Sequence, residues 1–412
     1  MASKKRVPSA TGKLLALFAL AWVGLAHAGA PLSPYPLSTA GRHIVDSQGN
    51  KIILKAVNWY GPHLEGQVVQ GLDQQPIENI VDRIKEWGFN AVRLPFSNAM
   101  LHDKHPVDPN LVKANPQFRG LTPLQVFDRT VEALAKGGVA IILNNHTSSS
   151  QWCCGYDANG LWFFQGTGGY EQTFNQFVDD WKMLAARYRS IPEVVAADLR
   201  NEVRTAMWGG FLSAASPNWG AGGNKDWHQA AQFTGNQILK THKDFLIIVE
   251  GINWQGALPF MGGKRPHLRP VRNRPIQLDV PGKLVYAAHN YSHIGPKHNG
   301  DKSTSKGQIT YGDMTESVFL QTLDEEWGYV LQDGTSYQAP VILSEFGASS
   351  DNATPSDRAW FERLTRYLYD REVSYAYWPL NHENYGLVNS DYSAILDGDW
   401  RRTSLDRILR RP

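Results

Sequence analysis

The sequence predicts an α/β protein built as a closed (β/α)8 barrel, a TIM barrel, with an N-terminal β-hairpin before it. Three observations favour this fold. Short apolar runs alternate with amphipathic stretches of helical period, the apolar runs are continuous, and eight of them follow one another from Ile52 onward. Continuous apolar strands joined by helices pair in parallel and are covered on both faces. An open doubly wound sheet is the alternative arrangement of the same elements.

The predicted strands follow in order along the chain. Residues 41–60 hold two apolar runs around the turn signal DSQGN, which predicts the hairpin and then a first barrel strand, Ile52 to Asn58. Seven further strands are predicted in NAVRLPF (90–96), VAIILNNH (139–146), VVAADLRNE (194–202), DFLIIVEGINW (244–254), KLVYAAHNY (283–291), PVILSEFG (340–347) and VSYAYWPLN (373–381).

Helices are predicted between most of these strands. The first shows the pattern well, because its apolar residues recur at helical spacing and Gly88 ends the stripe. The predicted helices cover residues 76–88, 123–138, 170–190, 226–243, 314–330 and 356–372.

The crossover at residues 255–282 departs from this pattern. It is rich in Pro and Arg and has no helical period, so we expect a long surface loop. Its basic residues are expected to be solvated, with binding to an anionic surface as the alternative: Lys264, Arg265, Arg269, Arg272 and Arg274.

The N-terminus has the pattern of a secretory signal peptide. Basic residues precede an apolar run from Leu14 to Leu25, and Ala26-His27-Ala28 follows as a small-x-small cleavage triplet. We expect residues 1–28 to be removed, leaving a single domain at 29–412 that is secreted, extracellular or periplasmic, without a membrane span. An uncleaved N-terminal anchor is the alternative.

Charge and cysteine content narrow the class of protein. With 41 Lys and Arg against 39 Asp and Glu, the net charge of +2 gives no field suited to nucleic acid. The two cysteines, Cys153 and Cys154, are adjacent, so we expect a bond between neighbours, with two free thiols as the alternative. Nothing in the sequence indicates the oligomeric state, so a monomer is expected by default.

Polar residues collect at the C-terminal ends of the predicted strands. In a barrel these ends meet at one rim, where active sites lie. Capping or a core ion pair would explain any one of them, but not their joint placement. The residues are Asn58, Arg93, Asn145, His146, Asn201, Glu202, His289, Tyr291, Glu345 and Trp378.

Two of these residues are carboxylates, Glu202 at the end of the fourth predicted strand and Glu345 at the end of the seventh. Such a pair suits glycoside hydrolysis, in which one acid protonates the leaving oxygen and the other carboxylate attacks the anomeric carbon. We expect a separation of roughly 5 Å, the retaining spacing. Arg93 beside Glu345 is expected to keep the nucleophile ionised.

Seven segments carry a family resemblance: VNWYG, AVRLPF, LNNHTS, LRNEVR, AHNYS, LSEFG and YWPLN. Over about residues 41–381 the chain resembles a family 5 glycoside hydrolase of the cellulase type. The resemblance implies Glu202 as acid/base and Glu345 as nucleophile. It further implies that Asn201 contacts the sugar 2-hydroxyl, and that Arg93 and Tyr291 support the nucleophile.

The resemblance also assigns residues to the substrate. His146 and His289 line the cleavage subsite, Trp378 stacks beneath the sugar, and Trp59 in VNWYG is a further substrate-binding residue. His63 and Glu65 in GPHLEG border the glycone-binding subsite, with a loop salt bridge as an equal alternative. Where the family's commonest motif is Asn-Glu-Pro, this chain has NEVR, which resembles a less common branch. The predicted substrate is a β-linked glucan or a related polysaccharide or glycoconjugate.

Two rival classes of protein fit the sequence less well. A metal-dependent barrel hydrolase needs a His-x-His near the first strand, but Asn-Trp-Tyr stands there, so neither metal nor cofactor is expected. A non-catalytic sugar-binding or cell-surface interaction protein is the remaining alternative. It would keep the aromatic residues, but it would have no reason to keep both glutamates.

Overall fold

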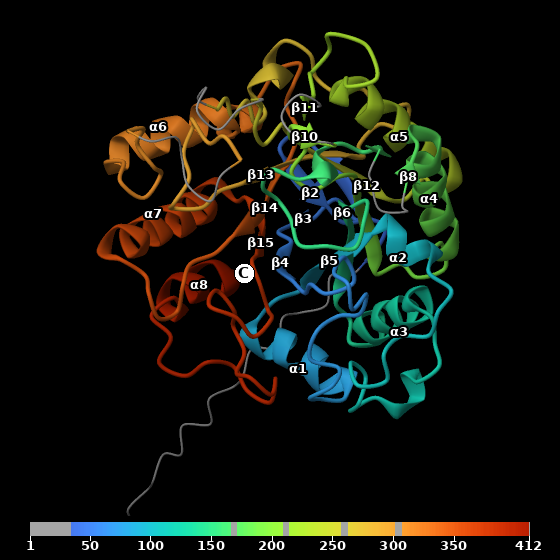
Figure 1. Ribbon diagram of the computed structural model, residues 1–412. Helices are drawn as coiled ribbons and strands as arrows, with labels where there is room; N and C mark the ends of the chain where they lie inside the picture. The colour runs from blue at the N-terminus through green and yellow to red at the C-terminus, as the bar shows by residue number, and fades with distance from the viewer. Residues whose placement is uncertain (1–33, 166–170, 209–213, 257–262, 301–306, 412) are drawn as a thin grey trace, which may run out of the picture.

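The computed structural model describes residues 34–165, 171–208, 214–256, 263–300 and 307–411 (Figure 1). Eight parallel strands form a closed barrel, which confirms the predicted (β/α)8 fold over the open sheet. Pairing of the last strand with the first closes it. The strands are β4 (Lys55–Asn58), β5 (Ala91–Ser97), β6 (Ala140–Thr147), β9 (Val194–Asp198), β12 (Leu246–Glu250), β13 (Leu284–His289), β14 (Val341–Phe346) and β15 (Ser374–Tyr377).

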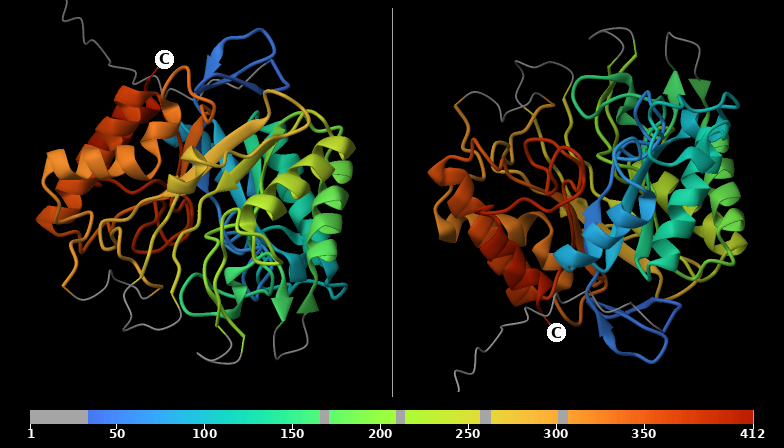
Figure 2. Two further views of the ribbon diagram at one scale, coloured as in Figure 1. Left: turned by 90° about the horizontal axis from the view of Figure 1, so that it is seen from above. Right: turned by 90° about the horizontal axis from the view of Figure 1, so that it is seen from below.

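Helices surround the barrel (Figure 2). All six predicted helices are present, and two that were not predicted, α2 (Asn98–His102) and α8 (Arg402–Leu409), join them. Helix α1 buries the predicted apolar stripe and ends at Gly88, whose φ of 100° is a left-handed conformation that glycine adopts without steric cost. The others are α3 (Pro123–Lys136), α4 (Phe174–Arg187), α5 (Trp227–Thr241), α6 (Glu316–Glu326) and α7 (Pro355–Arg371); α1 is Ile77–Trp87.

A small antiparallel sheet lies at one end of the barrel (Figure 2). It comprises β1 (Ser38–Ala40), β2 (His43–Val45) and β3 (Lys51–Ile52), so the predicted hairpin carries one more strand. Leu37 and Ile44 pack into the same apolar cluster as alanines of the barrel strands, such as Ala56 and Ala376. The sheet therefore covers the N-terminal end of the barrel interior and leaves the opposite rim for polar residues.

Two short strand pairs lie at that opposite rim. They are β7 (Phe164–Gln165) with β8 (Glu171–Gln172), and β10 (Ala206–Met207) with β11 (Ala214–Ala215). These pairs belong to the connections that follow β6 and β9. They show that the loops on this side are structured well beyond the strand ends.

The crossover at 255–282 is only partly the surface loop that was expected. In its described part, the one helical turn is η5 (Arg269–Arg272). Arg265, expected to be solvated, is 2% exposed and donates to Asn253 Oδ1 at 3.0 Å and to the His289 carbonyl at 3.1 Å. The expectation was wrong for Arg265 because these carbonyl acceptors replace water around its guanidinium.

The predicted signal peptide, residues 1–28, lies outside the described residues. In the part of the chain that is described, no helix combines the length and the apolar character that crossing a bilayer requires.

The packing of α7 on the barrel gives a first prediction. Leu364 is fully buried in the main apolar cluster, so Leu364→Ala removes packed methyl groups and leaves a cavity. We expect a loss of about 3 kcal/mol in the free energy of unfolding, measured by chemical denaturation. Glu362→Ala, on the exposed side of the same helix, is the control and should change stability by less than about 0.5 kcal/mol. Equal losses in both variants would contradict this packing.

Candidate active site

The predicted polar residues converge on a cleft of about 580 Å³ at the C-terminal rim of the barrel. Both glutamates line it, one after β9 and the other from β14. Of the remaining predicted site residues, His63, His146, Tyr291 and Trp378 line it directly. Further lining residues, which the sequence reasoning had not assigned to the site, are Trp152, Tyr156, Asp157, Asn253, Glu383 and Tyr385.

Glu202 and Glu345 face each other across His289. One oxygen of each carboxylate and a ring nitrogen of His289 all lie within 4.8 Å of one another. His289 Nδ1 is 2.9 Å from Glu202 Oε1 and 3.5 Å from Glu345 Oε2. The Tyr291 hydroxyl donates to Glu345 Oε2 at 3.1 Å. Two carboxylates this close leave no room for a water between them and a sugar.

Arg93 lies beneath this pair, fully buried. Its Nη1 donates to Glu345 Oε1 at 2.7 Å, and its Nη2 donates to Asn201 Oδ1 at 2.7 Å. Its remaining bonds reach Asn58 Oδ1 at 2.9 Å, Asp198 Oδ2 at 2.7 Å and Glu250 Oε1 at 3.0 Å. A buried cation is tolerated because it is paired and fully hydrogen-bonded. The guanidinium thereby fixes the nucleophile candidate and the neighbour of the acid candidate in one network.

Glu250 is a third carboxylate of the site, and the sequence reasoning missed it. It accepts the backbone N–H of Glu202 at 2.8 Å and lies 3.3 Å from His289 Nε2. Glu202 has a φ of 43°, a left-handed conformation that is costly for a residue with a side chain. The Glu250 bond therefore holds the backbone that aims Glu202 into the cleft. Its signal was in the sequence, since Glu250 ends an apolar strand as Glu345 does.

The charges in the site shift each other's pKa. Burial raises the pKa of Glu202, but the hydrogen bond and positive charge of His289 outweigh it and lower the pKa to about 2. Burial lowers the pKa of His289, but the carboxylates of Glu250 and Glu345 outweigh it and raise the pKa to about 10. In the resting site a proton therefore resides on His289, bonded to an ionised Glu202.

The pKa of Glu345 lies above its ordinary value because burial raises it more than its cationic neighbours lower it. Arg93 and His289 do lower this pKa, as the sequence reasoning expected of Arg93. The expectation was incomplete, because it did not include the burial of the carboxyl. The nucleophile candidate therefore ionises at a higher pH than an ordinary glutamate does.

Three rings form a stacked platform on one side of the cleft. Trp378 lies between Tyr60 and His146, with centroid distances of 5.3 Å and 5.5 Å and interplanar angles of 11° and 14°. Burial lowers the pKa of His146 well below its ordinary value, so the ring is neutral. Its Nδ1 donates to Asn144 Oδ1 at 2.8 Å, since that amide uses its Nδ2 on Asp198. His146 Nε2 then accepts from Asn201 Nδ2 at 3.4 Å.

Two predicted substrate-binding residues lie apart from this group. Trp59 is fully buried in the main apolar cluster, and its Nε1 donates to the Gln70 carbonyl at 2.9 Å. Glu65 is exposed and lines an adjoining hollow of about 660 Å³. Trp152, which is 54% exposed, borders both hollows. His63, predicted beside Glu65, lies instead in the main cleft, 4.3 Å from the His146 ring.

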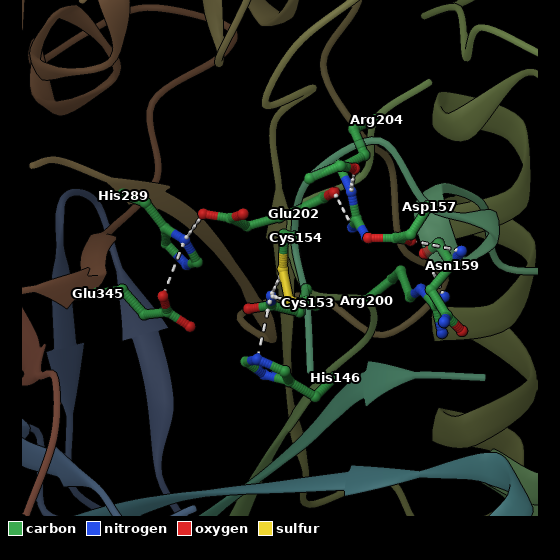
Figure 3. The surroundings of a disulfide bond; sticks show 12 residues. His146, Cys153, Cys154, Asp157, Asn159, Arg200, Glu202, Arg204, His289 and Glu345 are labelled. Carbon is green, nitrogen blue, oxygen red and sulfur yellow. Dashed lines mark hydrogen bonds and ion pairs between the residues drawn. A yellow bond between two sulfur atoms is a disulfide. The ribbon is translucent and has the colours of Figure 1, made fainter. Parts of the chain in front are cut away.

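Cys153 and Cys154 form the expected disulfide between neighbours. Figure 3 shows it between His146 and Glu202. Both sulfurs lie within 4.8 Å of a ring nitrogen of His146, and both cysteines line the cleft.

Among the described residues, two groups place three potential metal ligands within 4.8 Å of one another. In the first, His146 with Cys153 and Cys154, the sulfurs are bonded to each other and offer no thiolate. In the second, Glu202, His289 and Glu345, both ring nitrogens of the histidine already face protein partners. Its raised pKa also keeps the ring protonated, which is not the form that binds metal. Neither group fits a metal site.

Comparison with known proteins identifies the family of the chain. The family model described as Cellulase (glycosyl hydrolase family 5) matches residues 45–384. An endoglucanase from Paenibacillus polymyxa is 32% identical over 90% of this chain and 86% of the relative. The major extracellular endoglucanase of Xanthomonas campestris pv. campestris is 28% identical over 93% of this chain and 72% of the relative.

A solved structure shows the same fold and completes the comparison. The catalytic domain of the major endoglucanase from Xanthomonas campestris pv. campestris superposes with a TM-score of 0.72 at 26% identity, covering 91% of this chain and 100% of that one. The family resemblance seen in the sequence motifs is confirmed. By the match of the family model and of these relatives, the chain belongs to glycosyl hydrolase family 5.

Proposed function

We propose that this glycoside hydrolase cleaves a β-linked glucan at internal bonds and retains the anomeric configuration. The observation that carries the proposal is the spacing of Glu202 and Glu345, whose nearest oxygens lie within 4.8 Å. That distance matches the roughly 5 Å of retaining enzymes and falls short of the wider gap that admits a water for inversion. The relatives from Paenibacillus polymyxa and Xanthomonas campestris are endoglucanases, which supports internal cleavage.

In the first step the Glu345 carboxylate attacks the anomeric carbon while Glu202 protonates the departing oxygen. The C–O bond to the leaving sugar breaks, and a glycosyl ester forms on Glu345. In the second step Glu202, now ionised, removes a proton from water. That water attacks the same carbon, the ester bond breaks, and Glu345 leaves as a carboxylate. Two inversions give net retention.

In the resting site the proton lies on His289, whereas the acid step requires a protonated Glu202. The 2.9 Å bond from His289 Nδ1 to Glu202 Oε1 is the path for this transfer. A sugar that fills the cleft excludes water from His289 and Glu202. Because desolvation disfavours separated charges, the pair of protonated His289 and ionised Glu202 then becomes less stable relative to the neutral pair. Substrate binding then favours a neutral His289 and a protonated Glu202.

Sugar binding follows from the rings and amides around the pair. Trp378 lines the cleft with a ring that is 7% exposed, and Trp152 beside it, 54% exposed, offers aromatic surface to the apolar side of a sugar ring. Asn201 uses its oxygen on Arg93, so its Nδ2 is the group that can donate to the sugar 2-hydroxyl. The hollow beyond Trp152, lined by Glu65, Asp73 and His382, extends the binding surface past one sugar, as a polymer requires.

We further propose that the enzyme is exported. Residues 1–28 act as a signal peptide, residues 29–412 form one catalytic domain, and the enzyme works outside the cytoplasm as a monomer. The basic and then apolar composition of the N-terminal segment supports export. The description of one relative as extracellular is consistent with it.

The first product anomer tests the stereochemistry. Hydrolysis of a β-linked substrate should release the β-anomer first, since two displacements at one carbon restore the configuration. Proton NMR of the fresh product, recorded before mutarotation, measures this. An initial α-anomer would refute the retaining mechanism.

Azide rescue separates the roles of the two glutamates. Glu345→Ala should lose activity by at least about 10⁴-fold on every β-glycoside, and azide should give an α-glycosyl azide by direct displacement. Glu202→Ala should still react with an activated aryl glycoside, accumulate the glycosyl ester, and yield a β-glycosyl azide. Mass spectrometry of the trapped ester and NMR of the azides identify the products. Exchanged anomers would mean exchanged roles.

A pH profile tests the charge coupling. Glu250→Gln keeps an acceptor for the Glu202 backbone but removes a negative charge that raises the pKa of both Glu345 and His289. Both pKa values should therefore fall. The acid limb of kcat/KM, lost as Glu345 protonates, and the basic limb, lost as the His289 proton leaves, should both move to lower pH.

The matched control is Glu78→Gln, an exposed change on α1 that should leave both limbs in place. If Glu250→Gln moved only one limb, or moved either limb upward, the assignment of these limbs would be wrong.

A further inference from the structure

The loop that carries the disulfide is fixed to the turn that carries the acid candidate. We define the cleft loop as residues 148–160 and the acid turn as residues 200–204. Both nitrogen–oxygen contacts from Arg204 Nη2 to the Asp157 carboxylate measure 2.7 Å, and Arg204 Nε donates to the Gly155 carbonyl at 3.3 Å. Arg200 Nη2 donates to the Asn159 carbonyl at 2.7 Å. Figure 3 shows Arg204 and Asp157 facing each other beside the disulfide, with Arg200 and Asn159 next to them.

The disulfide itself contacts Asn201 in the acid turn. Asn201 Nδ2 lies 3.3 Å from Cys154 Sγ and 3.5 Å from Cys153 Sγ. The other side of this amide is already fixed, because Arg93 Nη2 donates to Asn201 Oδ1 at 2.7 Å. The amide therefore directs one N–H donor at the sulfurs and the other at His146 Nε2, 3.4 Å away, and all of these contacts are long enough to give way to a substrate hydroxyl.

Sulfur is a weak hydrogen-bond acceptor, and these contacts are long. The bulk of the two sulfur atoms excludes other orientations of the amide. As acceptors, however, the sulfurs satisfy its N–H donors only weakly. A carbonyl or hydroxyl oxygen in the same place would accept these N–H groups more strongly and compete with a substrate hydroxyl. A disulfide also has no S–H group that could donate back.

We propose that the Cys153–Cys154 disulfide is a positioning element for the reaction, which holds the Asn201 amide ready for the sugar 2-hydroxyl and leaves its donors available. This inference rests on the proposed function, since it assumes that Asn201 Nδ2 binds that hydroxyl. It adds a role for the two cysteines that packing alone does not require. Substrates without a 2-hydroxyl make no use of this contact.

The test compares an aryl β-cellobioside with its 2-deoxy analogue, altered in the reacting sugar, on four proteins: the wild type, Cys153→Ser with Cys154→Ser, Asn201→Ala, and the triple variant. The double cysteine variant should lose about tenfold or more in kcat/KM on the parent substrate, the effect of one poorly placed hydrogen bond. On the 2-deoxy substrate it should lose less than about twofold. In the Asn201→Ala background, removing the cysteines should change nothing further.

The same selective loss should follow reduction of the wild type, which covers the case of a variant that does not fold. A water-soluble phosphine converts the disulfide to two thiols and is itself oxidised to the phosphine oxide, with one water supplying the oxygen and two hydrogens. Alkylation and mass spectrometry count the thiols. Reoxidation with oxidised glutathione should restore the activity, and the cysteine-free variant should not respond to the phosphine.

The outcomes separate the two proposals. If Asn201→Ala discriminates between the substrates but loss of the disulfide does not, the positioning role is wrong and the proposed function stands. Equal losses on both substrates after disulfide removal would also overturn it, since a general structural role predicts that result. If Asn201→Ala does not discriminate, the assignment of Asn201 itself fails, and the positioning role fails with it.

Discussion

The site depends on the buried guanidinium of Arg93. Its donors reach Asn58, Asp198, Glu250, Glu345 and Asn201, which lie on or shortly after four other barrel strands. Because a buried cation without such partners would be prohibitively costly, each acceptor is held where the guanidinium fork requires it. The barrel brings strand ends together, but this one side chain sets how the carboxylates face the cleft.

Charge balance explains why the site holds protons. Within the network two cations meet four carboxylates, an excess of two negative charges if all were ionised: Arg93 and His289 against Asp198, Glu202, Glu250 and Glu345. Desolvation makes such an excess unfavourable, so it raises the pKa of Asp198 to about 7 and also raises that of Glu345. A reaction that moves a proton to a leaving group and back benefits from a site that already stores one.

The sequence predicted the barrel and most of the rim because both follow from periodicity. Parallel strands must end at one rim, so Arg93, Glu202 and Glu345 could be placed together without coordinates. Glu250 also follows an apolar run, and the same argument would have placed it at the rim. Arg265 could not be predicted, because its burial depends on a carbonyl of His289, a neighbour only in the folded chain. The burial of Trp59 could not be predicted either, since the path of the backbone after β4 decides whether this ring faces the cleft or the core.

The bonds between the cleft loop and the acid turn have an evolutionary consequence. In many barrel enzymes the loops vary while the strand ends persist, which lets substrate range drift without loss of chemistry. Here the loop that shapes the cleft beside Trp152 is tied through Asp157 and Arg204 to the segment that bears Glu202. An insertion or deletion in that loop would displace the acid as well as the binding surface. Substrate range and turnover are therefore coupled on this side of the cleft.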